Sequence, residues 1–243
     1  LPIRLLWLSL PPGRLPIFEK EECSPCLRSP RVEPCSFLMS NLNVSTPSRI
    51  GFFGGSFDPI HNGHLFIIEE FIQNFELDRL FLCPAYQAPL REKKPLFNPI
   101  QRLEMARLVA HSNQKLEVLD FEINQPKTSF TYETIQEVKK SYPKSKIFLA
   151  IGLDQFEKIS TWRWIRELSK EVHFIVFSRG RINAPAPSIF DIEYTFIQNP
   201  LIDISSTQIR KCLQKGESVA QWIPDVILSY LEKNNLLRQK DTS

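Results

Sequence analysis

From Arg49 onward, short apolar runs alternate with segments whose apolar residues recur at helical spacing. Continuous apolar runs bounded by turn residues are typical of strands buried on both faces, and helical spacing is typical of amphipathic helices. Strands that alternate with helices form βαβ units around a parallel sheet. The pattern predicts an α/β fold, a Rossmann-like doubly wound and mainly parallel sheet with helices on both faces.

The predicted strands cover residues 49–54, 79–83, 116–120, 146–151, 173–178 and 194–197. The predicted helices cover residues 63–75, 100–111, 131–141, 161–169, 206–214 and 224–234. Ligands of such folds bind beyond the carboxyl ends of the strands. Residues at those ends should therefore gather at one rim, among them Gly54, Pro84, Gly152–Asp154 and Ser178–Arg179.

The first 38 residues have a different character, because they are rich in proline and show no helical or alternating period. We expect residues 1–38 to be a disordered or non-native N-terminal extension, and residues 39–243 to be a single domain that starts at Met39. Cys23 and Cys26 are spaced as zinc ligands, with Cys35 nearby. A zinc site wants a fourth ligand, and this segment contains no histidine to supply it.

Composition excludes several classes of partner. The net charge is +3 and no basic stripe stands out, so no nucleic-acid partner is expected. No apolar run approaches the roughly 20 residues that a membrane helix needs. Cys83 and Cys212 lie in apolar contexts, which suits reduced thiols and predicts a cytoplasmic location.

The most specific motif is Gly-Phe-Phe-Gly-Gly-Ser-Phe-Asp-Pro-Ile-His-Asn-Gly-His at residues 51–64. A strand, a glycine pair and a tight turn lead into a helix, whose free N–H groups and positive dipole end suit a polyphosphate. His61 and His64 are three residues apart and can share a helix face, while Gly63 leaves room for a phosphate. The spacing does not match the zinc-protease motif, and the G-x-G-x-x-G fingerprint is absent.

A second motif, Ile-Ser-Ser-Thr-Gln-Ile-Arg at residues 204–210, places three hydroxyls at a helix start with an arginine one turn later. Ser205 or Ser206 is the expected N-cap. The remaining hydroxyls and the guanidinium group of Arg210 suit phosphate oxygens. Alone this is a weak signal, since such residues cap many helices, but it gains weight beside the first motif.

Together the two motifs resemble those of the HxGH nucleotidyltransferase superfamily and, within it, the nicotinate-nucleotide adenylyltransferases. The resemblance runs from about Arg49 to Leu237 and extends to three other segments: Ser129–Thr134 resembles the family's substrate loop, Gly152–Asp154 its nucleotide turn, and Trp162 its ring-stacking aromatic residue. One departure is Leu90, where the family usually has histidine, although Arg91 keeps the positive charge.

The resemblance implies transfer of AMP from ATP to nicotinate mononucleotide, giving deamido-NAD and pyrophosphate. The attacking phosphate is already largely ionised near pH 7, so no general base is needed. The implied catalytic residues are His61, His64 and Arg210, with His64 at the α-phosphate. The implied ATP-binding residues are Gly54, Gly55, Ser56, Phe57, Gly63, Gly152, Asp154, Ile204, Ser205, Ser206 and Thr207. The implied acceptor-binding residues are Arg91, Thr131, Tyr132 and Trp162. Mg²⁺ is expected with ATP, bridging phosphate oxygens with few protein ligands.

The sequence leaves several alternatives open. Trp162 either stacks on the pyridine ring or packs in the core, and Asp154 either binds ribose or adenine or caps a helix, whereas Trp164 is expected in the core. Other functions are transfer to nicotinamide mononucleotide or pantetheine phosphate, a cytidylyltransferase, and a non-catalytic nucleotide sensor. The expected partners are small molecules, and the sequence does not decide whether the chain forms a homo-oligomer.

Overall fold

The computed structural model describes residues 46–89, 94–179, 192–199 and 204–237. These residues belong to one compact unit that begins at Ser45. The expectations for residues 1–38, for Leu90 and for Arg91 lie outside the described part of the chain.

The core of the fold is a six-stranded sheet in the order β3-β2-β1-β4-β5-β6, in which every neighbouring pair is parallel. The strands are β1 (Arg49–Gly55), β2 (Arg79–Pro84), β3 (Leu116–Val118), β4 (Lys146–Gly152), β5 (Val172–Arg179) and β6 (Tyr194–Asn199). The strand order reverses between β1 and β4, where Phe53 lies opposite Ala150. This is the position at which doubly wound sheets bind ligands.

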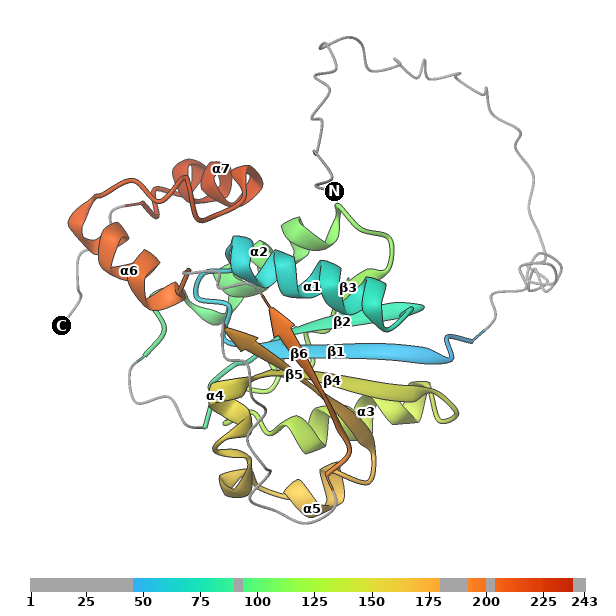
Figure 1. The fold of residues 1–243 in the computed structure, drawn as a ribbon. Coiled ribbons are helices and arrows are strands. Elements are labelled where there is room, and N and C mark those ends of the chain that lie inside the picture. The colour runs from blue at the N-terminus through green and yellow to red at the C-terminus, as the bar shows by residue number, and fades with distance from the viewer. Residues whose placement is uncertain (1–45, 90–93, 180–191, 200–203, 238–243) are drawn as a thin grey trace, which may run out of the picture. The chain divides into compact units, whose positions relative to one another are not determined.

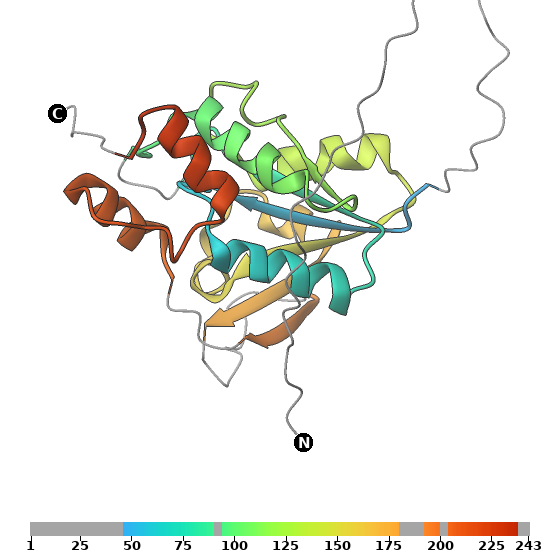
Figure 2. The same cartoon turned by 90° about the horizontal axis from the view of Figure 1, so that it is seen from above.

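Helices cover both faces of this sheet, as predicted (Figure 1). One face carries α1 (Asn62–Asn74), α2 (Pro99–Ala110), α6 (Ser206–Lys215) and α7 (Asp225–Lys233). The other carries α3 (Thr131–Ser141), α4 (Leu153–Phe156), the 3₁₀ turn η1 (Ile159–Thr161) and α5 (Ile165–Leu168). Figure 2 shows α7 lying beside α2, with which it is in contact.

Side chains of the strands alternate between these two faces. In β1, Phe53 belongs to the core under α1 and α2, whereas Ile50 and Phe52 belong to the core under α3 and α5. Because both faces are covered, the strands are apolar almost throughout, and this explains why their positions were readable as continuous apolar runs.

The structure corrects the predicted helix at residues 161–169. The segment contains the end of η1 and, separately, the four-residue helix α5. Trp162 has an extended backbone with a ψ of 132°, and Trp164 is left-handed with a φ of 59°. Neither conformation continues a right-handed helix. The strand predicted at residues 116–120 is shorter and ends at Val118.

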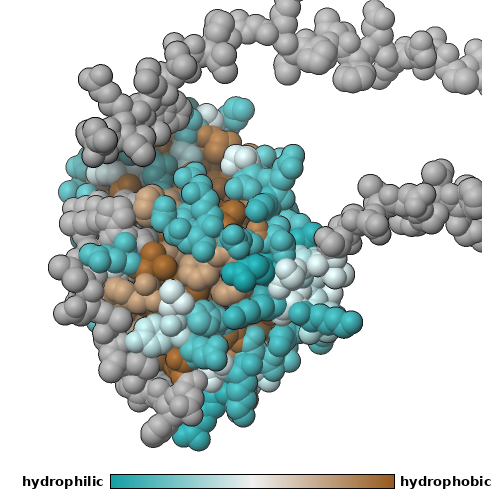
Figure 3. Space-filling model, turned by 45° about the vertical axis from the view of Figure 1, so that its right-hand side comes forward, coloured by the Kyte–Doolittle hydropathy of each residue, from teal (hydrophilic) through white to brown (hydrophobic). Residues whose placement is uncertain are grey.

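Apolar side chains are mostly inside. Figure 3 shows one face of the molecule, on which hydrophilic residues surround a smaller hydrophobic area. Among the described residues, Ile100 and Val226 are the most exposed large apolar side chains, at 59% and 41%. Ile223 is buried and Trp222 packs against the core. Across the described residues, none of the helices combines the length and apolar character needed to span a bilayer.

Candidate active site

The turn after β1 carries the first motif. Phe57 adopts a φ of 46°, which is rare for a bulky residue, and its ring is buried edge-on against Phe53 at 5.4 Å between centroids. The Phe57 side chain therefore acts as an anchor of the turn. The ring of this predicted ATP-binding residue therefore packs inside the turn.

His61 is the N-cap of α1 and is only 2% exposed, while His64 is the third residue of the helix and is partly exposed. Their rings stack with centroids 3.7 Å apart, and the His64 ring also lies edge-on to Phe57. The backbone N–H of His61 donates to Nδ1 of His64 at 3.2 Å. Because Nδ1 acts as an acceptor, this bond assigns the proton of a neutral His64 ring to Nε2, leaving that N–H as a donor.

Asp58 is buried in the same turn, with 1% of its surface exposed. Its carboxylate accepts the backbone N–H groups of Leu96 and Phe97 at 3.1 and 2.9 Å. Its Oδ2 also lies 3.5 Å from Nη1 of Arg210. The carboxylate thus connects the first motif, the approach to α2 and the second motif.

The second motif begins α6 directly against this turn. Ser205 is the N-cap, and its Oγ accepts the N–H of Gln208 at 3.2 Å. Ser206 Oγ donates to the carbonyl of Pro59 at 3.2 Å, and Arg210 Nη1 donates to the carbonyl of Asp58 at 2.8 Å. Segments nearly 150 residues apart in sequence therefore meet at one rim of the sheet. We call this group (residues 55–64 and 204–210) the nucleotide half-site.

The hydroxyl groups of the second motif have different hydrogen-bond partners. Thr207 Oγ1 accepts Nη2 of Arg210 at 3.0 Å, so it orients the guanidinium group. Ile204 is half-buried and packs against the core on the α1 side. Gly63 is buried in the first turn of α1, between the two histidines.

The end of β4 supplies the third part of the rim. Gly152 is the N-cap of the short helix α4, and Asp154 follows in its first turn with an exposed side chain. The N-cap alternative for Asp154 is therefore wrong. A Cβ on Gly152 would lie 2.6 Å from Oδ1 of Asp154, so glycine makes room for this carboxylate. At the end of β1, a Cβ on Gly54 or Gly55 would meet the rings of Phe52 or Phe57 at 3.1 Å.

The predicted acceptor residues lie at the start of α3. Thr131 and Tyr132 are its first two residues, and both are partly exposed. The preceding residues run beside the loop after β2: Ser129 N–H donates to the carbonyl of Gln87 at 3.0 Å, and Ser129 Oγ accepts the N–H of Tyr86 at 3.1 Å. We call residues 128–132 the acceptor segment.

The two tryptophans of this segment lie in different environments. Trp162 is half-buried and packs against the core under α3 and α5, so the packing alternative applies to at least part of its ring. Trp164, expected in the core, instead lies beside Phe130 and Tyr132 with ring centroids 5.6 and 5.8 Å apart. Arg163 stacks on the Trp164 ring at 4.0 Å.

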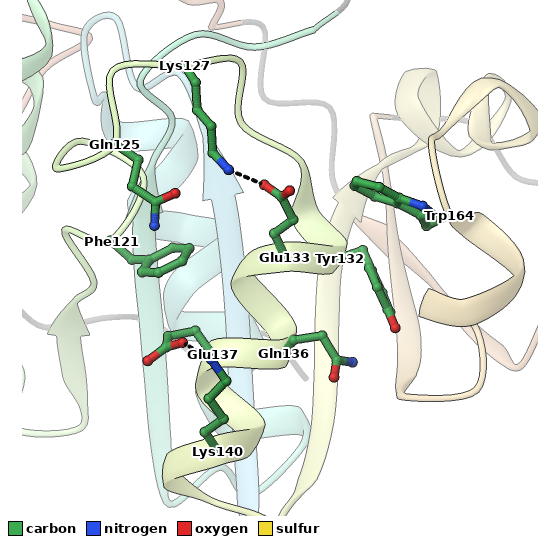
Figure 4. A pocket seen from close by; sticks show the side chains of 9 residues that line it. All are labelled: Phe121, Gln125, Lys127, Tyr132, Glu133, Gln136, Glu137, Lys140 and Trp164. Carbon is green, nitrogen blue, oxygen red and sulfur yellow. Dashed lines mark hydrogen bonds and ion pairs between the residues drawn. The ribbon is translucent and has the colours of Figure 1, made fainter.

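Trp164 and Tyr132 form one end of an open groove along α3 (Figure 4). Lys127 reaches over the groove to Glu133, with Nζ and Oε2 2.9 Å apart. The groove contains Tyr132 as its single predicted site residue and lies apart from the nucleotide half-site. Its charged residues are mostly paired with each other.

Arg102 is a buried residue that the sequence analysis did not identify. It belongs to α2, is fully buried, and donates to four backbone carbonyls. The acceptors are Ser56 (2.8 Å) and Ala85 (2.6 Å) for Nη1, Tyr86 (3.0 Å) for Nη2 and Phe97 (3.2 Å) for Nε. A signal was present, because Arg102 precedes Met105, Ala106 and Val109 at helical spacing and so falls on the buried face of α2.

Glu122 and Cys83 form a second buried polar group that was missed, behind the acceptor segment. Glu122 is 8% exposed, and its Oε1 accepts a hydrogen bond from the hydroxyl group of Thr134 at 2.7 Å. Burial raises the pKa of the Glu122 carboxyl, although hydrogen bonds from Thr134, Ser129 and Cys83 counteract part of this effect. Burial, reinforced by the negative charge of Glu122, raises the pKa of the Cys83 thiol well above its usual value. Cys83 is therefore an inert thiol.

The roles of Asp58, Arg102 and Glu122 were not predictable from residue type, for two reasons. Asp58 and Arg102 bind backbone atoms in other loops, and backbone partners have no residue-type signature. Glu122 is hydrogen-bonded by hydroxyl and thiol groups from other segments of the chain, and the sequence pattern does not link these segments to it.

No cluster of three or more His, Cys, Asp or Glu side chains suited to a metal occurs in the part of the chain that the structure describes.

Comparison with known proteins finds a matching protein family and related sequences. Residues 52–212 match the protein family described as "Cytidylyltransferase-like". A probable nicotinate-nucleotide adenylyltransferase of Methylacidiphilum infernorum is 32% identical over 195 residues, covering 80% of this chain and 95% of the relative. One from Opitutus terrae is 33% identical over 196 residues, covering 78% of this chain and 98% of the relative.

Solved structures agree on the fold. The nicotinic acid mononucleotide adenylyltransferase of Plasmodium falciparum, complexed with NaAD, matches with a TM-score of 0.64 at 22% identity. The match covers 78% of this chain and 97% of that chain. A second structure of that protein, complexed with APC, matches with a TM-score of 0.63 at 21% identity, covering 78% and 97% of the two chains.

Proposed function

This chain belongs to the nicotinate-nucleotide adenylyltransferase family, and from that premise we propose that its rim joins AMP from ATP to nicotinate mononucleotide. The products are deamido-NAD and pyrophosphate, so the enzyme is a nucleotidyltransferase of NAD biosynthesis. The observation that carries the proposal is the contact between the two motifs, through the bonds of Arg210 to Asp58 and of Ser206 to Pro59.

In the proposed reaction, a phosphate oxygen of the acceptor attacks the α-phosphorus of ATP. The bond from that phosphorus to the β-phosphate oxygen breaks, and pyrophosphate leaves with the electron pair. Because the attacking phosphate is already ionised, the protein supplies positioning and charge stabilisation. The imidazole, guanidinium and hydroxyl groups of the nucleotide half-site are proposed to perform these two tasks.

His64 is the proposed partner of the α-phosphate. Its Nδ1 accepts the His61 N–H, so the donor of a neutral ring is Nε2–H, and this group is proposed to donate to an oxygen that gains negative charge. His61 lies stacked against it at the N-terminus of α1, where the positive end of the helix dipole also favours an anion. Arg210, with Thr207 orienting it, and the hydroxyl groups of α6 are proposed to hold the β- and γ-phosphates.

Mg²⁺ is proposed to arrive with ATP and to neutralise phosphate charge. The donors of the half-site are imidazole, guanidinium and hydroxyl groups, which suit phosphate oxygens, and the buried Asp58 carboxylate is engaged by Leu96, Phe97 and Arg210. The half-site therefore fits an ion carried by the nucleotide more closely than one held by a protein cage.

For the acceptor, we propose that Thr131 and Tyr132 offer backbone N–H groups to the carboxylate at the start of α3, and that Trp162 contacts the ring. Relatives bear the nicotinate name, and this favours nicotinate over nicotinamide mononucleotide. We place the reaction in the cytoplasm, since Cys83 and Cys212 are free thiols.

The test is a turnover panel with ATP and one acceptor at a time: nicotinate mononucleotide, nicotinamide mononucleotide, pantetheine phosphate, or none. We expect pyrophosphate release to be fastest with nicotinate mononucleotide. His64→Ala should lower kcat by about 10²–10³, the usual cost of a lost preorganised donor. His111→Ala is the matched control, because His111 is an exposed residue beyond α2. A near-normal rate for folded His64→Ala would refute the role assigned to His64.

A further inference from the structure

Arg102 is a charged side chain placed where a charge is costly. It is fully buried in α2, next to core residues such as Met105 and Ala106. Removing a guanidinium group from water is unfavourable unless hydrogen bonds replace its hydration. The four carbonyl acceptors provide that replacement, and their positions suggest why an arginine is needed.

These carbonyls come from three separate loops. Ser56 lies in the turn after β1, Ala85 and Tyr86 follow β2, and Phe97 precedes α2. The planar guanidinium group has five N–H donors in a fixed arrangement, so it can hold several acceptors at defined relative positions. Lysine has three donors on a flexible stem and cannot reproduce this arrangement.

On one side, this network leads into the nucleotide half-site. Ser56 is two residues before Asp58, whose carbonyl accepts Arg210 at 2.8 Å. Phe97 is held at both ends, because its N–H donates to the Asp58 carboxylate and its carbonyl accepts Arg102. The turn that precedes His61 is therefore fixed against Arg102 both directly and through Phe97.

On the other side, the network leads into the acceptor segment. The carbonyl of Tyr86 accepts Arg102, and its N–H donates to Oγ of Ser129. Gln87 pairs with Thr128 in a parallel bridge and accepts the N–H of Ser129. Two residues later the chain reaches Thr131, at the start of α3.

We propose that Arg102 is a positioning residue that couples the nucleotide half-site to the acceptor segment. This inference rests on the proposed function in one respect: adenylyl transfer requires two bound substrates in fixed register. Reacting atoms must approach within about 3–3.5 Å, and a displacement of about 1 Å can cost about 10²-fold in rate. Arg102 touches neither substrate in this proposal, and it acts by setting the distance between the loops that do.

The test compares Arg102→Lys with Arg107→Lys. Both residues belong to α2, but Arg107 is exposed and pairs with Glu104 and Asp120 on the surface. We expect Arg102→Lys to lower kcat by at least about tenfold, while the Kd of an ATP analogue and of the acceptor, each measured alone, change by less than about threefold. A residue that only stabilised the fold would lower Tm and leave kcat intact below the unfolding temperature. A folded Arg102→Lys with the kcat of Arg107→Lys would overturn the proposal.

Hydrogen exchange of the unaltered protein provides a second test, which holds even if Arg102→Lys does not fold. A non-hydrolysable ATP analogue alone should slow exchange in peptides that contain residues 55–58 and also in those that contain 85–87 and 128–131. Slowing at 55–58 without slowing at 128–131 would contradict the coupling. This measurement involves no acceptor, so a wrong acceptor assignment, visible in the turnover panel, is distinguishable from a wrong role for Arg102.

Discussion

Replacing Asp58 with asparagine tests how the two motifs are held together. The substitution keeps the shape of the side chain but exchanges one carboxylate oxygen for an NH₂ group. In the folded protein both oxygens accept backbone N–H groups, from Leu96 and Phe97, and Oδ2 also faces Arg210. In either orientation of the new amide, at least one buried N–H donor faces another donor.

The size of the effect follows from these contacts. A buried donor without an acceptor costs about 1–3 kcal/mol, and exchanging a charged acceptor for a neutral one in the remaining bond costs about 1 kcal/mol more. The free energy of unfolding should therefore fall by about 2–4 kcal/mol. At about 2–4 °C per kcal/mol for a domain of this size, Tm should fall by about 5–15 °C.

The assay is urea unfolding followed by circular dichroism, together with a thermal scan at the same pH. Asp120→Asn is the matched control, because Asp120 is partly exposed and its ion pair with Arg107 lies at the surface. Such pairs contribute about 0–1 kcal/mol, so this variant should unfold close to the unaltered protein. If Asp58→Asn unfolds within about 0.5 kcal/mol of Asp120→Asn, the carboxylate does not hold the turn in the way argued.

Three further outcomes are expected. Burial raises the pKa of Glu122, so the folded state binds the proton of this carboxyl more tightly than the unfolded state does. The contribution of Glu122 to the free energy of unfolding should therefore fall as pH rises above about 4.5. Glu122→Gln should remove this pH dependence in urea unfolding measured across pH. Gly152→Ala has an acceptable φ of −76° but puts a Cβ against the Asp154 carboxylate, so the KM for ATP should rise with little change in Tm, and an unchanged KM would argue against Asp154 as a nucleotide ligand. Trp162→Ala should raise the acceptor KM by about 5–150-fold if its ring stacks, from about 1–3 kcal/mol of stacking, and more than Trp164→Ala does; equal effects would point to packing alone.

Much of the fold was predictable because the sheet is covered on both faces. Residues such as Ile50, Phe52 and Phe53 enter opposite cores, so the strand reads as one apolar run with clear limits. The segment between β4 and β5 was not predictable in the same way. Its helical spacing is real, but Trp162 and Trp164 adopt extended and left-handed backbones that residue type does not indicate.

The same distinction applies to the candidate site, where the residue types were predictable from the sequence and their arrangement was not. His61, His64, Ser206 and Arg210 were predictable because their chemistry is visible in the motifs, and the structure brings them to one rim. Their mutual arrangement was not predictable, because it depends on bonds to carbonyl and amide groups. Arg102 alone left a trace, as a charged residue on the apolar face of its helix.

Asp58 and Arg102 both bind backbone groups of the loops at this rim, and they do so with opposite charges. Loops beyond the ends of parallel strands carry N–H and C=O groups that the sheet cannot pair, and burying them unpaired would be costly. The Asp58 carboxylate accepts the N–H groups of this rim, and the Arg102 guanidinium group donates to its carbonyls, with Phe97 bound by both. Charge-assisted bonds are about twice as strong as neutral ones, so two side chains suffice to fix several loops. The positions of His64 and of the acceptor segment then depend on residues that need not contact either substrate, and this is why substitutions at Asp58 and Arg102 should alter both stability and turnover.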